Sequence, residues 1–191
     1  GANPLYATSA ADSAVSRLVF SGLMKYDRNN QLIGDLAEAI SVNDRGLRYE
    51  VRLRPNLRWQ DGRPLTAADV VFTYQTIQNP DARSPLFSGW QGVTVEATNV
   101  RTVVCTLPNQ LGSFPHSLTN GIVPRHLLAD IPAAQLRSSR FNTVSPVGSG
   151  PFKWGTVEVS GTTQENREER IGLTRNEHFY NAPAKLDQFI V

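Results

Sequence analysis

Hydrophobic and charged side chains alternate most regularly over residues 46–54. The apolar positions of this segment are Leu47, Tyr49, Val51 and Leu53. The residues between them are all charged, which gives the segment a period of two. That period is typical of a strand with one buried face, and half-buried strands of this kind are usually antiparallel. The segment therefore predicts an antiparallel strand that covers one side of a core.

A helix is predicted over residues 67–78. Thr66 precedes this segment and Asp69 stands three positions later, which is the spacing of a capping box. Apolar residues then recur at helical spacing, namely at Val70, Val71, Tyr74 and Ile77. Asp61–Gly62, shortly before the helix, is typical of a tight turn. The chain is therefore expected to leave the strand, turn and enter a helix that packs by one face.

Residues 11–26 predict an earlier helix, with Asp12 as its N-cap and Gly22 near its end. The apolar positions that favour it are Val15, Leu18 and Val19. Residues 32–40 contain four aliphatic residues and predict a short buried segment.

Two further strand pairs and two short helices complete the pattern. Strands are expected over 92–97 and 100–107, joined by Thr98–Asn99, then over 152–159, 168–175 and 186–191. Short helices are expected over 125–129 and 132–137, and loops over 79–91 and 142–151. The mixture of antiparallel strands and helices indicates an α+β (mixed α/β) fold. Because the last strand reaches the end of the sequence without a partner, we interpret the chain as part of a longer protein.

Composition supports a globular fold and narrows the function. Of the 191 residues, 40% are hydrophobic and 19% are charged, which is unlike a disordered chain. The formal net charge is +2, and charges of both signs are spread along the chain, so we expect no nucleic-acid partner. The only cysteine, Cys105, excludes an internal disulfide and is interpreted as a small buried side chain. No segment has the apolar length of a membrane span, and residues 1–5 do not resemble a signal peptide.

Catalytic and metal-binding motifs are missing from the sequence. His116, His126 and His178 are far apart and no HExxH is present, so no metal site is predicted. Gly148–Ser149–Gly150 fits neither a nucleophile elbow nor a phosphate-binding loop. We therefore predict no catalytic residue, no cofactor and no enzymatic activity. The row Arg48, Arg52 and Arg54 is interpreted as a solvated strand face.

Several motifs together resemble those of the extracytoplasmic solute-binding protein family 5, the peptide/nickel-type binding proteins of ABC importers. The central part of the resemblance is the stretch from Leu36 to Phe72, which includes LRWQDGRPLTAADVVF. Farther on, PVGSGPFK at 146–153 is similar to the family's NPVGTGPY, and residues 175–187 are similar to its RNPDYW…YLD segment. Ser21–Gly22–Leu23 resembles the family's EGL element, with serine in place of the usual glutamate. The motifs occur in the family's order over nearly the whole chain.

The resemblance implies a type-C periplasmic-binding-protein-like fold of which this chain holds only a part. Residues 1–40 would form the first segment of lobe I, and residues 41–146 an extra subdomain of antiparallel strands and helices. Residues 147–191 would return to lobe I, and the second lobe would be absent from the chain.

The implied function is the capture of a peptide or similar small solute between two lobes, followed by delivery to an ABC permease in the membrane. The implied protein is monomeric and acts in the periplasm or at the extracellular face of the membrane, with its signal peptide or lipid anchor removed. An alternative is a ligand-sensing or partner-interaction domain that uses the same scaffold without transport. The resemblance leaves oligopeptide, dipeptide, nickel chelate, sugar and opine open as ligands.

The candidate ligand-binding residues also follow from the resemblance. They are Thr8, Ser9, Ser21, Gly22, Leu23 and Asn120. The first five belong to the N-terminal segment and the EGL-like element, and Asn120 lies in a loop bounded by proline and glycine. Because the groups that fix a peptide's ends would lie largely on the other lobe, we expect this chain alone to bind ligand weakly.

Overall fold

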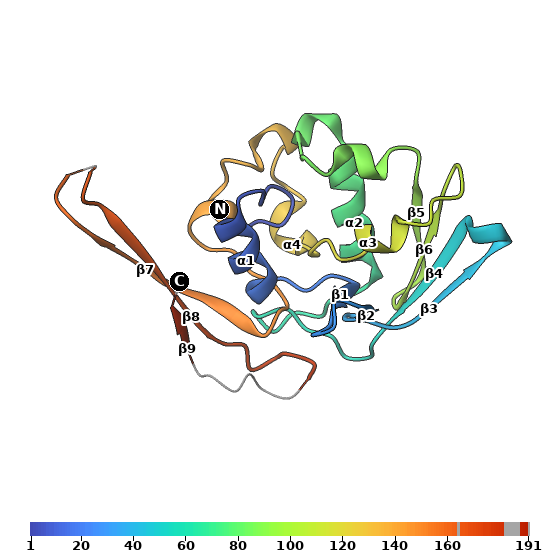
Figure 1. The fold of residues 1–191 in the computed structure, drawn as a ribbon, viewed down its shortest axis with the longest axis horizontal. Coiled ribbons are helices and arrows are strands. Elements are labelled where there is room, and N and C mark those ends of the chain that lie inside the picture. The colour runs from blue at the N-terminus through green and yellow to red at the C-terminus, as the bar shows by residue number, and fades with distance from the viewer. Residues whose placement is uncertain (164, 182–187, 191) are drawn as a thin grey trace.

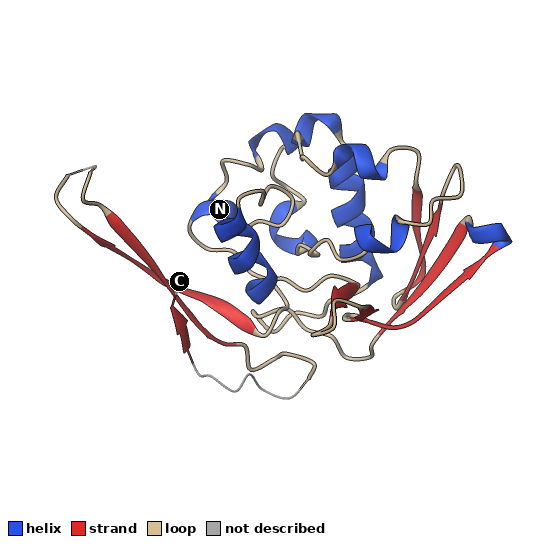
Figure 2. Cartoon of the chain, in the orientation of Figure 1, coloured by secondary structure: helices blue, strands red, loops and turns tan. Residues whose placement is uncertain are grey.

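The computed structural model describes residues 1–163, 165–181 and 188–190. The first half contains α1 (Ala10–Val19), β1 (Met24–Tyr26), β2 (Leu32–Gly34), β3 (Ala37–Asn43), β4 (Arg48–Leu53) and α2 (Ala67–Gln78). The second half contains β5 (Thr94–Asn99), β6 (Thr102–Thr106), α3 (Phe114–Ser117), α4 (Arg125–Leu128), α5 (Arg140–Thr143), β7 (Phe152–Ser160), β8 (Glu168–Arg175) and β9 (Gln188–Ile190). Helices gather in the middle of the molecule, with a sheet on either side (Figures 1 and 2). The prediction of a mixed fold of helices and antiparallel strands is confirmed.

Strand β4 lies inside a four-stranded antiparallel sheet of order β3-β4-β6-β5. Its partners in register include Val51 with Val103 and Tyr49 with Cys105, and these four side chains are buried. The alternation that predicted the strand thus sorts apolar side chains onto the face covered by α2, which contacts β5 and β6.

Helix α2 begins and ends where its sequence predicts. Thr66 accepts a hydrogen bond from the amide of Ala68, and the carboxylate of Asp69 accepts one from the amide of Thr66 at 2.9 Å. Asp69 also accepts from the amide of Arg125 at 2.9 Å, so one buried carboxylate joins the starts of α2 and α4. The capping box therefore serves tertiary structure as well as the helix itself.

Aromatic side chains fill the core between α2 and the sheet. Tyr74 stacks on Trp90 with ring centroids 3.9 Å apart, and Phe114 contacts both Trp90 and Tyr49. Beside them, Cys105 on β6 is fully buried, and burial raises the pKa of its thiol to about 12. The interpretation of Cys105 as a small buried side chain is confirmed.

The first helix is shorter than predicted. Ser9 caps α1 in place of Asp12, because its side chain accepts a hydrogen bond from the amide of Asp12. The helix ends at Val19, and Phe20 has extended backbone angles. Residues 24–26, which were predicted to be helical, form β1 and pair with β2. The segment 32–40 is likewise divided between β2 and β3, and Ile33 within it is 39% exposed.

Other boundaries differ in smaller ways. The turn between β5 and β6 is Val100–Arg101, because β5 continues through Thr98–Asn99. Residues 80–82 and 87–90 of the predicted loop form 3-10 turns, and α5 begins before the predicted loop at 142–151 and includes its first two residues. The helix predicted over 132–137 is a 3-10 turn, Ala133–Gln135. The short helix over 125–129 is confirmed as α4.

The third sheet, of order β7-β8-β9, lies on the opposite side of the helices from the four-stranded sheet (Figure 1). Strands β7 and β8 confirm the predicted pair, with Phe152 opposite Arg175 and Trp154 opposite Leu173. Of the strand predicted over 186–191, residues 188–190 form β9 and pair with β8, so this segment has a partner in the structure. Residues 186, 187 and 191 lie outside the described residues.

Three segments that are distant in sequence meet at the end of α1, and we call this meeting point the crossing. The side-chain amide of Gln60 donates to the carbonyls of Val19 and Phe152, and its oxygen accepts from the amide of Gly148. Gly150 donates its own amide to the Val19 carbonyl at 2.8 Å. A Cβ atom at Gly148 would lie 2.0 Å from that carbonyl oxygen, so only glycine fits there.

Candidate functional site

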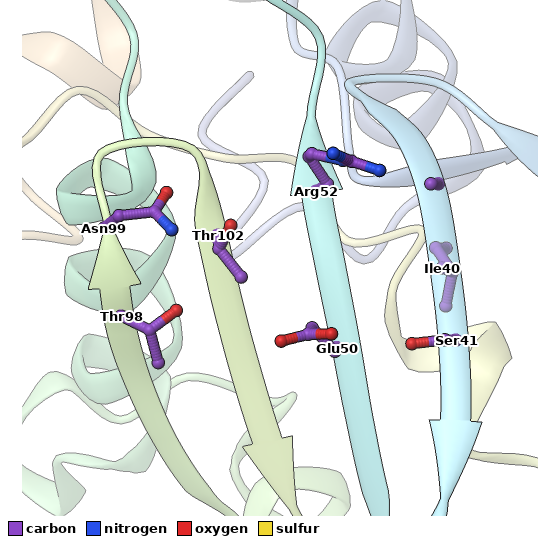
Figure 3. Close-up of a pocket in the computed structure, with 8 residues that line it drawn as sticks. Ile40, Ser41, Glu50, Arg52, Thr98, Asn99 and Thr102 are labelled. Atoms are coloured by element: carbon purple, nitrogen blue, oxygen red, sulfur yellow. The ribbon is translucent and has the colours of Figure 1, made fainter.

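Three hollows on the surface of the described residues can be compared, and they differ in chemistry. The first lies on the outer face of the four-stranded sheet and has a volume of about 380 Å³. Figure 3 shows Glu50 and Arg52 on β4 between Ser41 of β3 and Thr102 of β6. It is a wide, mostly polar hollow, and none of the described residues that line it is aromatic. It therefore lacks the apolar walls that usually hold a small solute.

The second hollow, of about 300 Å³, lies between the segment 85–90 and α3. Asn120 and His116 line it on one side, and Trp90 lines it on the other. It is more open than the third hollow and is smaller.

The third hollow is a cleft of about 450 Å³ beside the end of α1, which we call the cleft. Its lining residues come from α1, the β1–β2 hairpin and the loops that pack against them. They are Arg17, Phe20, Ser21, Gly22, Met24, Lys25, Tyr26, Asn30, Asp35, Thr119, Pro151 and Phe179. Aromatic walls combined with a few polar and charged groups are typical of small-solute sites, so the cleft is the best candidate site.

The loop after α1 is held in place by its backbone. The carbonyl of Ser21 accepts from the amide of Ile122, and the carbonyl of Gly22 accepts from the amide of Leu36. A Cβ atom at Gly22 would lie 2.6 Å from the carbonyl oxygen of Thr119. The close approach of these two backbones therefore requires glycine and shapes one wall of the cleft.

A buried carboxyl group is among the residues that line the cleft. Asp35 is 7% exposed, and Tyr180 donates its hydroxyl to Asp35 Oδ1 at 2.5 Å. Desolvation raises the pKa of Asp35, while hydrogen bonds from Tyr180 and Ser21 and the charges of Lys25 and Arg54 oppose the shift. Burial and the neighbouring Asp35 carboxyl raise the pKa of Tyr180 above its ordinary value. The pair is therefore a fixed hydrogen-bonded unit beside the cleft.

Arg54 contacts both members of this Asp35–Tyr180 pair. Its Nε donates to the backbone carbonyl of Asp35 at 2.6 Å, and its guanidinium lies 4.4 Å from the centre of the Tyr180 ring. The interpretation of Arg54 as part of a solvated arginine row is therefore wrong, whereas Arg52 does face solvent. Sequence alternation placed Arg54 on the outer face, but the strand ends at Leu53 and the chain turns there.

An aromatic pair lies between the cleft and the second hollow, which Asn120 lines. The hydroxyl of Tyr26 and Nδ1 of His116 are 2.7 Å apart, and the two rings stack with centroids 5.8 Å apart. Tyr26 lines the cleft and His116 lines the hollow, so the two cavities are neighbours.

The predicted ligand-binding residues are only partly brought together. Ser21 and Gly22 line the cleft, whereas Asn120 lines the neighbouring hollow. Leu23 is fully buried in the core, and Thr8 and Ser9 lie outside both cavities, Ser9 as the cap of α1.

Sequence reasoning missed the charged and aromatic members of the cleft. Arg17 and Lys25 were not among the predicted ligand-binding residues, and Asp35 and Tyr180 are 145 residues apart. Asp35 offered no local signal, because acidic side chains are seldom buried without a partner and its partner Tyr180 is distant in the sequence.

Neither a metal-binding group of side chains nor a membrane-spanning helix is found among the described residues. Residues 1–163, 165–181 and 188–190 contain no group of three or more His, Cys, Asp or Glu side chains placed to hold a metal ion. Over the same ranges, none of the helices combines the length and the apolar character that crossing a bilayer requires.

Comparison with known proteins identifies the family. Residues 31–191 match the profile of the bacterial extracellular solute-binding proteins, family 5 Middle. The oligopeptide-binding protein AppA of Bacillus subtilis is 34% identical over 188 residues, which cover 97% of this chain and 33% of AppA.

Two solved structures share the fold. The structure of Bacillus subtilis AppA in complex with a nonapeptide matches with a TM-score of 0.88 and 31% identity, over 98% of this chain and 36% of that one. NikZ from Campylobacter jejuni in complex with Ni(L-His) matches with a TM-score of 0.85 and 33% identity, over the same shares. The chain therefore spans about a third of the length of the relatives it matches. The partial periplasmic-binding-protein-like fold is confirmed, and the chain belongs to the bacterial extracellular solute-binding proteins of family 5.

Proposed function

We propose that this chain provides one wall of a solute-binding site, in a protein that captures peptides or similar small solutes for an ABC importer. The observation that carries the proposal is the cleft, where Ser21 and Gly22 of the EGL-like element lie beside charged groups and aromatic walls. Relatives of the same fold bind a nonapeptide and Ni(L-His), both of which carry amino acid groups. The aromatic residues Phe20, Tyr26 and Phe179 suit the apolar parts of such solutes.

The division of the chain into lobe segments is part of the proposal. Residues 1–40 and 147–191 would belong to lobe I, and residues 41–146 to the extra subdomain. The crossing supports this division, because Gln60 of the central part bonds to Val19 and Gly148 of the two flanking parts. Multiple hydrogen bonds at that point would let the three parts move as one body when a second lobe closes.

Capture would work through closure of the protein around the solute. Ligand that binds the closed state more tightly shifts the population toward it, and the closed form is then recognised by a membrane permease. The site would act outside the cytoplasm, as the family does, and would need no chemistry on the solute. A single wall leaves much of a solute exposed, so residues 1–191 alone should bind more weakly than micromolar.

The full reading frame that encodes this chain allows a direct test. The purified protein would be screened by thermal shift against oligopeptide pools, dipeptides, nickel with histidine, and neutral sugars. A bound solute at a hundred times its Kd adds about 2.7 kcal/mol of stability, which raises the Tm by several degrees. Peptide pools should produce this shift.

Two results would contradict the proposal. One is the absence of a shift with every solute class. The other is micromolar binding by residues 1–191 alone in isothermal titration calorimetry, because it would show that one wall suffices. Retention of a macromolecule together with no solute binding would favour the alternative, a partner-interaction domain.

A further inference from the structure

The aromatic wall of the cleft comes from two distant parts of the chain. Phe20 directly follows α1 and Tyr26 ends β1, whereas Phe179 lies in the segment after β8. Phe20 is 3% exposed, and its amide donates to the Ser16 carbonyl at 2.8 Å, so its position is set by α1 itself. Phe179 instead depends on contacts between segments that are far apart in the sequence.

The backbone before Phe179 is anchored to the loop that leads into β7. Asn176 is 1% exposed, its amide donates to the Pro151 carbonyl at 2.9 Å, and its side chain donates to the Gly150 carbonyl at 2.8 Å. The amide of Phe179 in turn donates to the Asn176 carbonyl at 3.2 Å. These bonds place the backbone of the segment, but the rotamer of the Phe179 ring is left to the side chains around it.

Tyr180 is the neighbour that holds this ring. The centroids of the Phe179 and Tyr180 rings are 4.6 Å apart and the rings are tilted by 46°, which is within the favourable range for an aromatic pair. The Tyr180 hydroxyl donates to Asp35 Oδ1 at 2.5 Å, and the Arg54 guanidinium lies 4.4 Å from the centre of the Tyr180 ring. Tyr180 is therefore held at its hydroxyl and at its face by residues that precede α2.

The acceptor of the Tyr180 hydroxyl is itself fixed. Asp35 is 7% exposed, its amide donates to the Leu23 carbonyl at 2.8 Å, and its carbonyl accepts from Arg54 Nε at 2.6 Å. Burial and the Asp35 carboxyl raise the pKa of Tyr180, so the hydroxyl keeps the proton that it donates at neutral pH. A short hydrogen bond to a fixed acceptor thus sets one orientation of the Tyr180 ring.

We infer that Asp35 and Tyr180 are positioning residues, which hold the Phe179 ring in the cleft wall and thereby favour solutes that carry an aromatic side chain. The inference rests on the proposed function, because it assigns a specificity to the same site. A ring that is already ordered loses little conformational entropy when a solute packs against it. An aromatic side chain gains more from such a ring than a methyl group does, because it adds contact area and a favourable ring–ring geometry.

The test compares tripeptides that differ by one phenyl ring. The full-reading-frame protein is titrated with trialanine and with the three tripeptides that contain one phenylalanine and two alanines. The aromatic ratio is the affinity for the best phenylalanine tripeptide divided by the affinity for trialanine. The wild type should have a ratio of about ten, the scale of one aromatic contact. Phe179→Ala should lower the ratio to about two, because Phe20 and Tyr26 remain.

The positioning residues are tested through the same ratio. Tyr180→Phe removes the donor of the hydrogen bond and Asp35→Ala removes the acceptor, so each should lower the ratio about threefold, the effect of ordering one freed side chain on binding. Asp35→Asn keeps an acceptor and should restore the wild-type ratio. In the Phe179→Ala background, Tyr180→Phe should lower the ratio no further, because a positioning residue acts only through the ring that it holds.

Tyr6→Phe is the matched control. Tyr6 also donates its hydroxyl, to the Ala82 carbonyl at 2.7 Å, and the Arg137 guanidinium lies 5.3 Å from the centre of its ring. Tyr6 is not among the described residues that line the cleft, so its variant should keep the wild-type ratio. Since each variant is compared with itself on two kinds of tripeptide, a partial loss of stability does not change the ratio.

The possible failures are distinguishable. If the wild type binds trialanine and the phenylalanine tripeptides equally, or if Tyr180→Phe lowers the ratio as much without the Phe179 ring as with it, the inference is wrong and solute capture stands. Binding of nickel with histidine or of neutral sugars, without any tripeptide, has the same meaning. If no solute of any class binds, the proposed function is overturned and the inference falls with it.

Discussion

The crossing and the cleft lie side by side at the end of α1, yet they use polar groups in opposite ways. At the crossing, both ends of the Gln60 amide are bonded to backbone groups of Val19, Gly148 and Phe152. In the cleft, Arg17 and Lys25 line a cavity without an ion pair in the described residues. The comparison teaches that polar groups whose hydrogen-bonding capacity is filled within the protein fix the architecture. Polar groups beside them that lack such partners are available for a solute.

The largest effect is expected at the crossing, from Gly148→Ala. The new Cβ would lie 2.0 Å from the Val19 carbonyl oxygen and 2.8 Å from its carbon, and neither backbone can yield without breaking hydrogen bonds. We expect a loss of about 4 kcal/mol or more in the free energy of unfolding, measured by urea denaturation. Gly112→Ala is the control, because no atom of the described residues lies within 4 Å of its added Cβ. Equal stability of the two variants would refute the close packing of the crossing.

A smaller loss is expected from Gln60→Leu. Leucine fills a similar volume but removes two donors and one acceptor, so the buried carbonyls of Val19 and Phe152 and the amide of Gly148 lose a partner. The expected cost is about 3 kcal/mol in the same denaturation experiment. Gln75→Leu, on the exposed side of α2, should change stability by less than about 0.5 kcal/mol. A Gln60→Leu protein as stable as wild type would mean that the crossing does not depend on this amide.

The smallest effect is expected in the cleft, from Asp35→Asn. Asparagine can still accept the Tyr180 hydroxyl, but it carries no charge to desolvate. Because the pKa of Asp35 is raised in the folded state, the penalty on its ionised form is present above that raised pKa. The penalty disappears as the pH falls toward the ordinary value of 3.8. Wild type should therefore gain stability relative to the variant on acidification.

The measurement for Asp35 is the difference in unfolding free energy between wild type and Asp35→Asn from pH 7 down to pH 3.5. All other titrating groups are common to both proteins, so the difference isolates this carboxyl. A difference that stays constant with pH, or that changes in the opposite direction, would show that Asp35 is not buried as described.

Local signals were enough to predict α2 and β4. The Thr66 and Asp69 capping box and the alternation around Tyr49 and Val51 each lie within a few residues of the element they define. The family motifs were recognisable for the same reason, because they report the fold of a continuous segment. The EGL-like element, and with it Ser21 and Gly22, was located in this way.

The end of α1 could not be predicted, because its cause lies elsewhere in the chain. The carbonyl of Val19 accepts from Gly150 and from the Gln60 side chain, and these partners replace a further helical turn. The apolar residues after Val19 continue the hydrophobic pattern, so sequence periodicity extends the helix too far. Asp35 and Tyr180 pose the same difficulty, since 145 residues separate the two ends of their hydrogen bond.

Cys105 offers a way to measure how often the four-stranded sheet opens. It is the one thiol of the sequence, it lies in the sheet beside the Tyr74 and Trp90 stack, and its raised pKa keeps it protonated at neutral pH. Thiol reagents attack the thiolate, so they can modify Cys105 only after β6 has separated from its neighbours. The rate at which Cys105 is modified, measured by mass spectrometry, therefore reports how often the sheet opens, and no label has to be introduced.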